Sequence, residues 1–328
     1  MRIAVDAMGG DYAPQQAVLG CVLAAKEEQI ASVLVGRSEE ISQELAQYED
    51  YPQDLITIKD AREVVEFTDH PAMAVRKKRD SSIVVANQLV KAGEADAVIS
   101  AGNTGAAMTA SLFILGRIPG ISRPAIAIPL PTVKGVTVLL DAGANAENDP
   151  EDLVQFGVMG TIYASSVLGL ESAKVGLLSI GEEETKGNKL VVEAHQLLKT
   201  SGLDFIGNVE GKDLLMGMAD VVVCDGFVGN IILKFAEGMA AALFQKMKEA
   251  LLQSPVTKLG ALAIKPSMKK LKASFDYAEY GGAPLLGVKG VSIISHGRSD
   301  AKAFKNAIKA AANAVQQDMI GKIRNSFV

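Results

Sequence analysis

Six polar segments, rich in glycine, asparagine and aspartate, each follow an apolar run in this chain, and together they could bind an anion. Their residues are Asp6, Gly9, Gly10 and Asp11; Asn103, Thr104 and Gly105; Asp141, Gly143 and Asn145; Lys186, Gly187 and Asn188; Asp225, Gly226, Gly229 and Asn230; and His296. Glycine lets a ligand approach the backbone closely, and free N–H groups at a helix N-terminus bind anions. The set predicts a phosphate-binding, catalytic rim. Any single turn of this kind can also use the same residues only for its dihedral angles and capping.

Acyl transfer to phosphate is a reaction that such a rim could catalyse without a covalent enzyme nucleophile. Because phosphate is itself a nucleophile, the site has to hold two anionic reactants together and stabilise the oxyanion formed at a thioester carbonyl. We assign phosphate binding to Lys186, and phosphate or oxyanion donation to Asn188, Asn230 and the backbone of residues 226–230. The alternative for Lys186 is a solvated lysine in a surface loop.

Motifs of several other enzyme classes are missing. The chain contains no G-x-x-x-x-G-K-[ST], no G-x-G-x-x-G and no G-x-S-x-G, which argues against a P-loop NTPase, a standard dinucleotide fold and an α/β-hydrolase. His195 falls inside a helix and His70 in a turn, and only His296 ends an apolar run. Cys21 and Cys224 lie far apart in apolar segments, which predicts buried, reduced thiols. We therefore expect no Cys-rich or His-rich metal site.

Short apolar runs alternate along the chain with stretches of helical periodicity. The runs cover residues 2–6, 32–36, 96–100, 136–141, 174–180, 220–225 and 291–295. Helices are expected from Pro14, from Ser81 to Ala92, and from Pro150 to Gly169. Continuous apolar strands between helices are typical of a parallel sheet covered on both faces. We predict the α/β class, with one three-layer αβα domain over residues 1–328 and a mostly parallel sheet. The polar segments should then meet at one edge of this sheet.

The segment from Ile231 to Phe275 breaks this alternation, because it shows helical periodicity interrupted only at Ser254-Pro255. We predict a protruding helical hairpin over residues 231–275. From Lys246 to Lys272 it carries seven lysines and a single acid. The apolar residues between these lysines include Leu259, Leu262 and Ile264. Such a basic amphipathic element suits an anionic membrane surface. A dimer interface with a lysine-rich rim is the alternative, and both can hold at once.

A second basic run, Arg76, Lys77, Lys78 and Arg79, precedes the helix expected from Ser81. It is interpreted either as a docking patch for an acidic carrier protein or pantetheine phosphate, or as a solvated face. The net charge of −5 argues against general binding of nucleic acid. We read no secretory signal at the N-terminus and no uninterrupted apolar window of membrane-spanning length, so we expect a cytoplasmic protein.

Nine motifs, in their order along nearly the whole chain, resemble the PlsX family of bacterial phosphate acyltransferases. They are VDAMGGD-x-AP, VRKKRDSS, ISAGNTGA, LLDAGAN, KGN at residues 186–188, FIGNVEG-x-DLL, DGFVGN, YGGAPLLG and HGRSDA-x-A. The resemblance implies a fold related to isocitrate and isopropylmalate dehydrogenases and to phosphotransacetylases. By the same motifs, Lys186 and Asn230 would be the leading catalytic positions, with Asp225 and Gly226 beside them. The family usually has histidine where this chain has Tyr12, which argues against an essential acid–base role there.

The resemblance also implies the reaction and its partners. The reaction would convert thioesters of acyl carrier protein, with inorganic phosphate, to acyl phosphates for phospholipid synthesis, without metal or nucleotide. The protein would be a homodimer, peripheral at the inner face of the cell membrane, with a glycerol-3-phosphate acyltransferase as a downstream partner. Two rival interpretations remain at this point. One is an enzyme on a similar sheet, either a coenzyme A-dependent phosphotransacetylase or a dehydrogenase needing magnesium and NAD(P). The other is a non-catalytic scaffold for acyl carrier protein.

Overall fold

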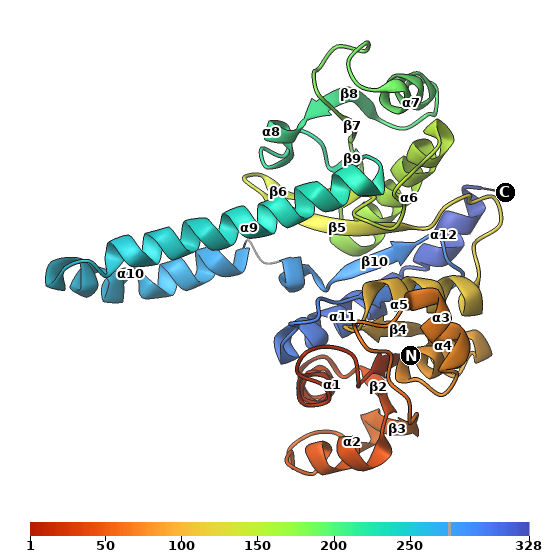
Figure 1. Ribbon diagram of the computed structural model, residues 1–328, viewed down its shortest axis with the longest axis vertical. Coiled ribbons are helices and arrows are strands. Elements are labelled where there is room, and N and C mark those ends of the chain that lie inside the picture. The colour runs from red at the N-terminus through yellow and green to blue at the C-terminus, as the bar shows by residue number, and fades with distance from the viewer. Residues whose placement is uncertain (275–276, 328) are drawn as a thin grey trace.

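The computed structural model describes residues 1–274 and 277–327, which fold around a large twisted sheet with helices on both faces (Figure 1). The strands are β1 (Arg2–Asp6), β2 (Ala31–Gly36), β3 (Ile56–Asp60), β4 (Ala97–Ser100), β5 (Ala125–Thr132), β6 (Gly135–Leu140), β7 (Val175–Ser179), β8 (Phe205–Glu210), β9 (Val221–Val223), β10 (Ala283–Leu286) and β11 (Val291–Ile294). All of them belong to a single sheet in the order β3-β2-β1-β4-β11-β10-β5-β6-β9-β7-β8.

The helices connect these strands and cover the sheet. They are α1 (Gln15–Glu28), α2 (Ser38–Leu45), α3 (Pro71–Lys77), α4 (Ser82–Ala92), α5 (Thr104–Ala110), α6 (Pro150–Leu168), α7 (Lys189–Lys199), α8 (Gly211–Leu214), α9 (Gly226–Leu251), α10 (Pro255–Ser274), α11 (Ala301–Gln316) and α12 (Met319–Asn325). Short non-α turns are η1 (Gln53–Leu55), η2 (Ser111–Leu115) and η3 (Tyr277–Tyr280).

The sheet consists of two parallel groups that run in opposite directions. Strands β3, β2, β1, β4 and β11 pair in parallel, and so do β6, β9, β7 and β8. Three antiparallel pairings, β11 with β10, β10 with β5 and β5 with β6, separate the groups and reverse the direction. On either side of β10 and β5, the carboxyl ends of the two groups therefore point in opposite directions. This corrects the simple expectation of one edge, because the short hairpin from β5 to β6 lacks a crossover helix.

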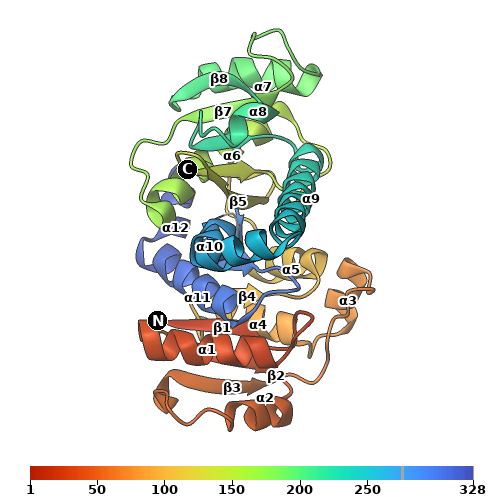
Figure 2. The same ribbon diagram turned by 90° about the vertical axis from the view of Figure 1, so that its left-hand side faces the viewer.

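The core lies on both faces of the sheet, as a three-layer arrangement requires. One hydrophobic cluster joins the sheet to α1, α6, α7, α11 and α12, and α1 packs along α11 (Figure 2). Another joins it to α3, α4, α5, α8 and the first turns of α9. Successive strand residues alternate between clusters: Ile3 and Val5 face the first, whereas Ala4 faces a third cluster on the opposite side. Both faces are apolar, which explains the continuous apolar runs in the sequence.

Helices α9 and α10 contact each other and extend away from the sheet (Figure 1). Phe275, the last residue of the predicted 231–275 segment, lies outside the described residues. Among the described residues, α9 alone is long and apolar enough to cross a membrane by length and composition, and only 11% of that window is buried. No membrane-spanning segment was predicted here, because Lys234 and Glu237 interrupt the apolar residues of α9. The core helix of a soluble protein meets the same criteria of length and composition.

Local signals placed most boundaries correctly. Pro150 begins α6 behind an Asp149–Asp152 capping box, and Gly93 ends α4 with a φ of 74°. All seven apolar runs contain strands, namely β1, β2, β4, β6, β7, β9 and β11. Strands β3, β5, β8 and β10 were not predicted. In β5 and β10, proline interrupts the sequence, and in β3 and β8 many side chains are not buried, so neither pair has a strong strand signal.

Candidate active site

The Asp141 carboxylate organises the turn that follows β6. It is fully buried and accepts hydrogen bonds from the backbone N–H groups of Ile126 at 3.0 Å, Gly143 at 3.2 Å, Ala144 at 3.0 Å and Asn145 at 2.7 Å. The side-chain Nδ2 of Asn145 donates to the same carboxylate at 2.9 Å. Burial raises the pKa of Asp141, and these hydrogen bonds oppose that rise. The carboxylate therefore fixes the loop around itself and has little capacity left for a ligand.

Asn145 was predicted to bind substrate, but its side chain is used inside the protein. Besides Asp141, its Nδ2 donates to the Pro124 carbonyl at 2.7 Å, so it ties the turn after β6 to the start of β5. The structure thus gives Asn145 a supporting position.

Helix α9 begins directly against this turn. Asp225 is its N-cap, and its carboxylate accepts from the Val228 N–H at 2.9 Å. The amides of Gly226 and Phe227, as the first of the helix, have no intrahelical acceptor, and Phe227 is exposed whereas Gly226 is buried. A side chain at Gly226 would collide with the Asn145 carbonyl, so only glycine lets the helix approach this closely.

Asn230 lies in the second turn of α9 with its side chain exposed. A Cβ placed on Gly143, whose φ is +126°, would lie 3.3 Å from the Asn230 Cβ and Cγ. The side chain of Asn230 therefore lies directly over the Gly143 turn. This brings together the predicted residues Asp225, Gly226, Gly229 and Asn230 with Gly143 and Asn145 around Asp141.

Lys186 lies in the loop after β7, the strand next to β9. Its side chain is exposed, whereas both of its backbone groups are bound: its N–H donates to the Glu183 carbonyl at 3.0 Å, and its carbonyl accepts from Ser179 Oγ at 3.0 Å. The backbone is therefore fixed while the ammonium is accessible to solvent. Asn188 caps α7, because its Oδ1 accepts from the Val191 N–H at 2.9 Å. Only its amide nitrogen remains available as a donor.

The turns after β1, β4 and β11 form a second cluster in the other parallel group. Asp6 is buried and accepts from Ser100 Oγ at 2.7 Å and from the Met8 N–H at 3.2 Å. Burial raises the pKa of Asp6, and hydrogen bonds from Ser82 and Ser100 oppose this. Gly9 packs on this carboxylate. Ser100 was missed as a support for Asp6, because nothing in the sequence links two residues 94 positions apart.

Residues after β11 close this cluster. The Gly297 carbonyl accepts from the Asp11 N–H at 2.7 Å and lies against Gly10. His296 is exposed, and its Nδ1 accepts from the Arg298 N–H at 3.0 Å. Tyr12 is also exposed, at 53%. A cavity of about 10 Å³ beside Asp6 has room for about one water molecule. It is too small for a substrate, so a ligand of this cluster would bind at the surface.

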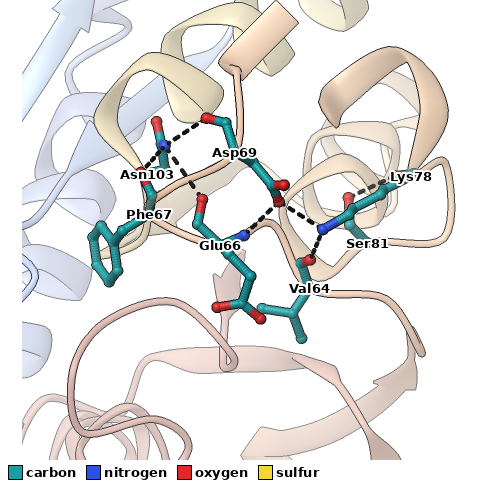
Figure 3. Close-up of polar contacts among 7 residues, drawn as sticks. All are labelled: Val64, Glu66, Phe67, Asp69, Lys78, Ser81 and Asn103. Atoms are coloured by element: carbon teal, nitrogen blue, oxygen red, sulfur yellow. Dashed lines mark hydrogen bonds and ion pairs between the residues drawn. The ribbon is translucent and has the colours of Figure 1, made fainter. Parts of the chain in front are cut away.

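Asn103 and Lys78 both bind the loop between β3 and α3, a role that was not predicted for either residue (Figure 3). Asn103 caps α5 by accepting from the Ala106 N–H at 3.0 Å, and its Nδ2 donates to the Phe67 carbonyl at 3.1 Å. The neighbouring predicted residues Thr104 and Gly105 form the first turn of α5, with Thr104 exposed.

Lys78 Nζ donates to Asp69 at 2.6 Å and to the Val64 carbonyl at 2.8 Å (Figure 3). The hydrogen bond from Lys78 to Asp69 is the main reason that the pKa of Asp69 lies below its ordinary value. Lys78 therefore departs from the predicted basic patch, because its charge is already paired inside the fold. Arg76, Lys77 and Arg79 are exposed.

The structure thus brings the predicted residues together in two clusters, one on each parallel group. Among the described residues, no group of three or more His, Cys, Asp or Glu side chains could hold a metal ion. Both cysteines are free thiols and buried. What the clusters offer chemically is helix-terminal N–H groups, an exposed lysine and exposed amides, which suit phosphate and a developing oxyanion.

Comparison with known proteins places the chain among acyl-transferring enzymes of lipid synthesis. A family model described as "Fatty acid synthesis protein" matches residues 1–322. A phosphate acyltransferase of Desulfitobacterium hafniense is 57% identical over 328 residues, covering 100% of this chain and 97% of that protein. A phosphate acyltransferase of Pelotomaculum thermopropionicum is 55% identical over 327 residues, covering 100% of this chain and 95% of that protein.

Solved structures share the fold at low sequence identity. A phosphotransacetylase from Streptococcus pyogenes aligns with a TM-score of 0.65 and 19% identity, covering 96% of this chain and 94% of that one. A 4-hydroxythreonine-4-phosphate dehydrogenase from Klebsiella pneumoniae aligns with a TM-score of 0.53 and 15% identity, covering 96% and 99%. These likenesses establish a shared mixed α/β architecture with a large central sheet.

Proposed function

Because the chain belongs to the PlsX family of phosphate acyltransferases, we propose that it moves a fatty acyl group from acyl carrier protein to inorganic phosphate. The product is an acyl phosphate for phospholipid synthesis. The observation that carries this proposal is the arrangement after β9 and β7, two neighbouring strands. There, free helix-terminal amides and the exposed Asn230 belong to the turn next to the loop that presents Lys186.

Sheet twist supports a single site built from both clusters. Neighbouring strands rotate by about 20–25°, so the six steps from β1, third in the order, to β9, ninth, accumulate about 120–150°. Without twist, β1 and β9 would point about 180° apart, because they belong to groups of opposite direction. The accumulated twist reduces the angle between their directions to about 30–60°. In addition, α5 and the start of α9 share one hydrophobic cluster, and both lie on the same side of the sheet in Figure 2. The two sets of turns can therefore line one cleft.

In the proposed reaction, a phosphate oxygen attacks the carbonyl carbon of the thioester, a C–O bond forms, and the C–S bond of the tetrahedral intermediate breaks. The thiolate leaves with the electron pair of that bond and takes the proton of the hydrogen phosphate. Lys186 and the first amides of α9 would hold phosphate, while Asn230 would donate to the oxyanion. Asn188, through its remaining amide nitrogen, would assist the phosphate. No residue becomes covalently modified, which agrees with the lack of a nucleophile motif.

The donor's carrier protein is proposed to dock on Arg76, Lys77 and Arg79. These side chains are exposed at the C-terminal end of α3, and α3 packs against α5 beside the Asp6 cluster. A positive patch near the site would attract an acidic carrier and speed its encounter. Lys78 is excluded from this patch because Asp69 neutralises it.

Helices α9 and α10 are proposed to mediate dimerisation and to contact an anionic membrane, which would place this cytoplasmic protein peripherally at the inner face of the membrane. Along α9, Ile231, Phe235, Met239 and Leu243 recur every four residues and are more than half exposed. A contiguous apolar stripe of this kind marks an interaction surface. On α10, Leu259 and Leu262 are exposed among lysines. Sedimentation of a monomer at micromolar concentration would contradict the dimer.

The proposed reaction is tested by mixing the purified protein with palmitoyl acyl carrier protein and phosphate, without metal or nucleotide, and trapping acyl phosphate with hydroxylamine. We expect hydroxamate that depends on both phosphate and enzyme. If product forms with palmitoyl coenzyme A but not with palmitoyl acyl carrier protein, the acyl donor is a coenzyme A thioester. If neither thioester gives product while the protein is folded and the thioester intact, a non-catalytic scaffold for acyl carrier protein is the remaining interpretation.

A further inference from the structure

We propose that His195 and Asn208 form a buried latch that fixes the backbone of the Lys186 loop, and that both are positioning residues for the reaction. This inference rests on the proposed function of Lys186. Neither side chain is exposed to a substrate, because His195 is 3% and Asn208 7% exposed. Their effect on catalysis would therefore be exerted through the loop.

The latch begins on helix α7 and passes to strand β8. The Nδ1 atom of His195 lies 2.8 Å from the Oδ1 atom of Asn208, so the imidazole donates and the amide oxygen accepts. The ring of Phe205 packs edge-on against the imidazole, with a centroid distance of 5.1 Å and an interplanar angle of 75°. The imidazole and the Asn208 amide are therefore held in one orientation, with the amide nitrogen directed toward the loop.

From Asn208 the latch reaches the backbone that carries Lys186. Asn208 Nδ2 donates to the Glu183 carbonyl at 2.9 Å, and the Lys186 N–H donates to the same carbonyl at 3.0 Å. Ser179 Oγ binds the Lys186 carbonyl from the other side. The peptide of Glu183 is thus the shared point between the buried latch and the exposed lysine, and a shift of this peptide would displace the Lys186 backbone.

Charged side chains around the latch come from the same loop and helix. Glu184 Oε1 lies 3.9 Å from His195 Nε2, and it accepts from Lys199 Nζ at 2.7 Å. Hydrogen bonding to Lys199 is the main reason that the pKa of Glu184 is lowered. A side chain needed here only to fill space would be apolar, because burying imidazole and amide groups costs free energy unless each is hydrogen-bonded. The hydrogen bond from Asn208 to the Glu183 carbonyl therefore explains why His195 and Asn208 are polar.

Positioning matters because the lysine side chain is long and its loop is exposed. Displacing a catalytic group by about 1 Å can lower the rate by a factor of about 100. A loop that follows a strand on the surface would otherwise lose conformational entropy each time Lys186 met phosphate. The latch removes part of that loss before the substrate arrives.

Asn208→Asp is the sharpest test, because it retains the acceptor for His195 and replaces the donor to the Glu183 carbonyl with an oxygen. We expect kcat/KM for phosphate to fall about 10- to 100-fold, with KM for acyl carrier protein unchanged. Hydrogen exchange of the amides of residues 181–188 should accelerate, while β1 and α11 stay protected. Glu193→Gln, on the exposed face of α7, is the matched control and should change neither measurement.

A second pair of variants keeps the test informative if Asn208→Asp folds poorly. His195→Gln retains a donor toward Asn208 and should preserve most activity, whereas His195→Leu should reproduce the loss and the faster loop exchange. Wild-type kcat/KM in both Asn208→Asp and His195→Leu overturns the latch, and so does an activity loss with unchanged loop exchange. Lys186→Ala is assayed in parallel: if it retains full activity, the proposed role of Lys186 fails, while loop exchange still decides whether the latch exists.

Discussion

Asn145 binds the Asp141 carboxylate twice, through its backbone nitrogen at 2.7 Å and its side-chain Nδ2 at 2.9 Å. Both residues belong to the rim predicted to bind an anion. In the structure they hold each other, and Asp141 also fixes the start of β5 through Ile126. The close packing of the α9 N-terminus against the turn after β6 depends on these hydrogen bonds, because Gly226 packs directly onto Asp141 and Asn145.

We expect Asp141→Asn to destabilise the protein by roughly 3 kcal/mol, because an amide cannot accept from all five of these buried or partly buried donors and places its own N–H groups against some of them. Urea unfolding at pH 7 measures the loss. Glu147→Gln, on the exposed part of the same loop, is the control and should stay within about 0.5 kcal/mol of wild type. An unchanged unfolding midpoint in Asp141→Asn would mean that the carboxylate does not organise the turn.

We expect Lys186→Ala to lower turnover by about 10²–10³, the usual cost of removing one donor to a developing charge. Thermal unfolding should stay unchanged because the side chain is exposed. The measurement is phosphate-dependent hydroxamate formation. Lys189→Ala removes a lysine three residues on, whose ammonium faces Glu193, and should retain activity. Near-wild-type kcat/KM in Lys186→Ala would refute its catalytic role.

We expect Lys78→Met to destabilise the protein at neutral pH, because Asp69 and the Val64 carbonyl lose their donor. The pKa of Asp69 is lowered in the folded state from an ordinary 3.8, so the stabilisation is complete above that pH. It is lost as the pH falls through the lower folded-state pKa. The difference in urea midpoint between wild type and Lys78→Met should therefore shrink as the pH is lowered below about 4. A difference that grows on acidification would contradict this account, and Lys77→Met is the exposed control.

We expect the double variant Arg76→Glu, Lys77→Glu to raise KM for acyl carrier protein about tenfold or more at low salt, with kcat unchanged, because charge reversal opposes the encounter of an acidic partner. The effect should diminish as added salt shortens the range of the interaction. Steady-state kinetics at several salt concentrations measure both. A KM insensitive to the double variant would remove the docking patch. Lys91→Glu, a single charge reversal at an exposed position of α4, is the control.

We expect Leu259→Glu with Leu262→Glu to reduce co-sedimentation with anionic vesicles at least tenfold without abolishing activity in solution, since both side chains are exposed on α10, away from the sheet. Val133→Glu, an exposed apolar position on the β5–β6 turn, is the control. Equal partitioning of the double variant and wild type would leave α9 and α10 with dimerisation as their remaining proposed role.

Much of the local structure follows from short-range signals. The apolar runs, the proline at the first turn of α6 and the glycine after α4 act within a few residues, so their effect is readable along the chain. The weak strands β3 and β8 escaped detection because they are sheet edges whose half-exposed side chains carry little periodicity. Strands β5 and β10 escaped because pairing in the middle of the sheet overrides their prolines.

The candidate site was foreseen in its residue types and only partly in its geometry. Asp225, Gly226 and Asn230 lie together at the start of α9, beside the turn that holds Gly143 and Asn145. Asn103, Asn145 and Lys78 were predicted to contact a ligand or a partner, and in the structure each also binds another segment of the chain. Asn103 donates to the Phe67 carbonyl, Asn145 to the Pro124 carbonyl, and Lys78 to Asp69. Their identity gives no sign of this, because an amide or ammonium serves a carbonyl and a phosphate equally well.

The amino-acid sequence by itself determined the α/β class, the polar residues at the strand ends and, through nine motifs, the family. These depend on residue types and on contacts between near neighbours. Tertiary structure decided that the strands form two groups of opposite direction, that Asp6 meets Ser100, and that His195 reaches the Lys186 loop through Asn208. Such pairings depend on which segments the folded sheet brings side by side, and the hydrophobic driving force that selects them is non-directional, so no local pattern records the partner.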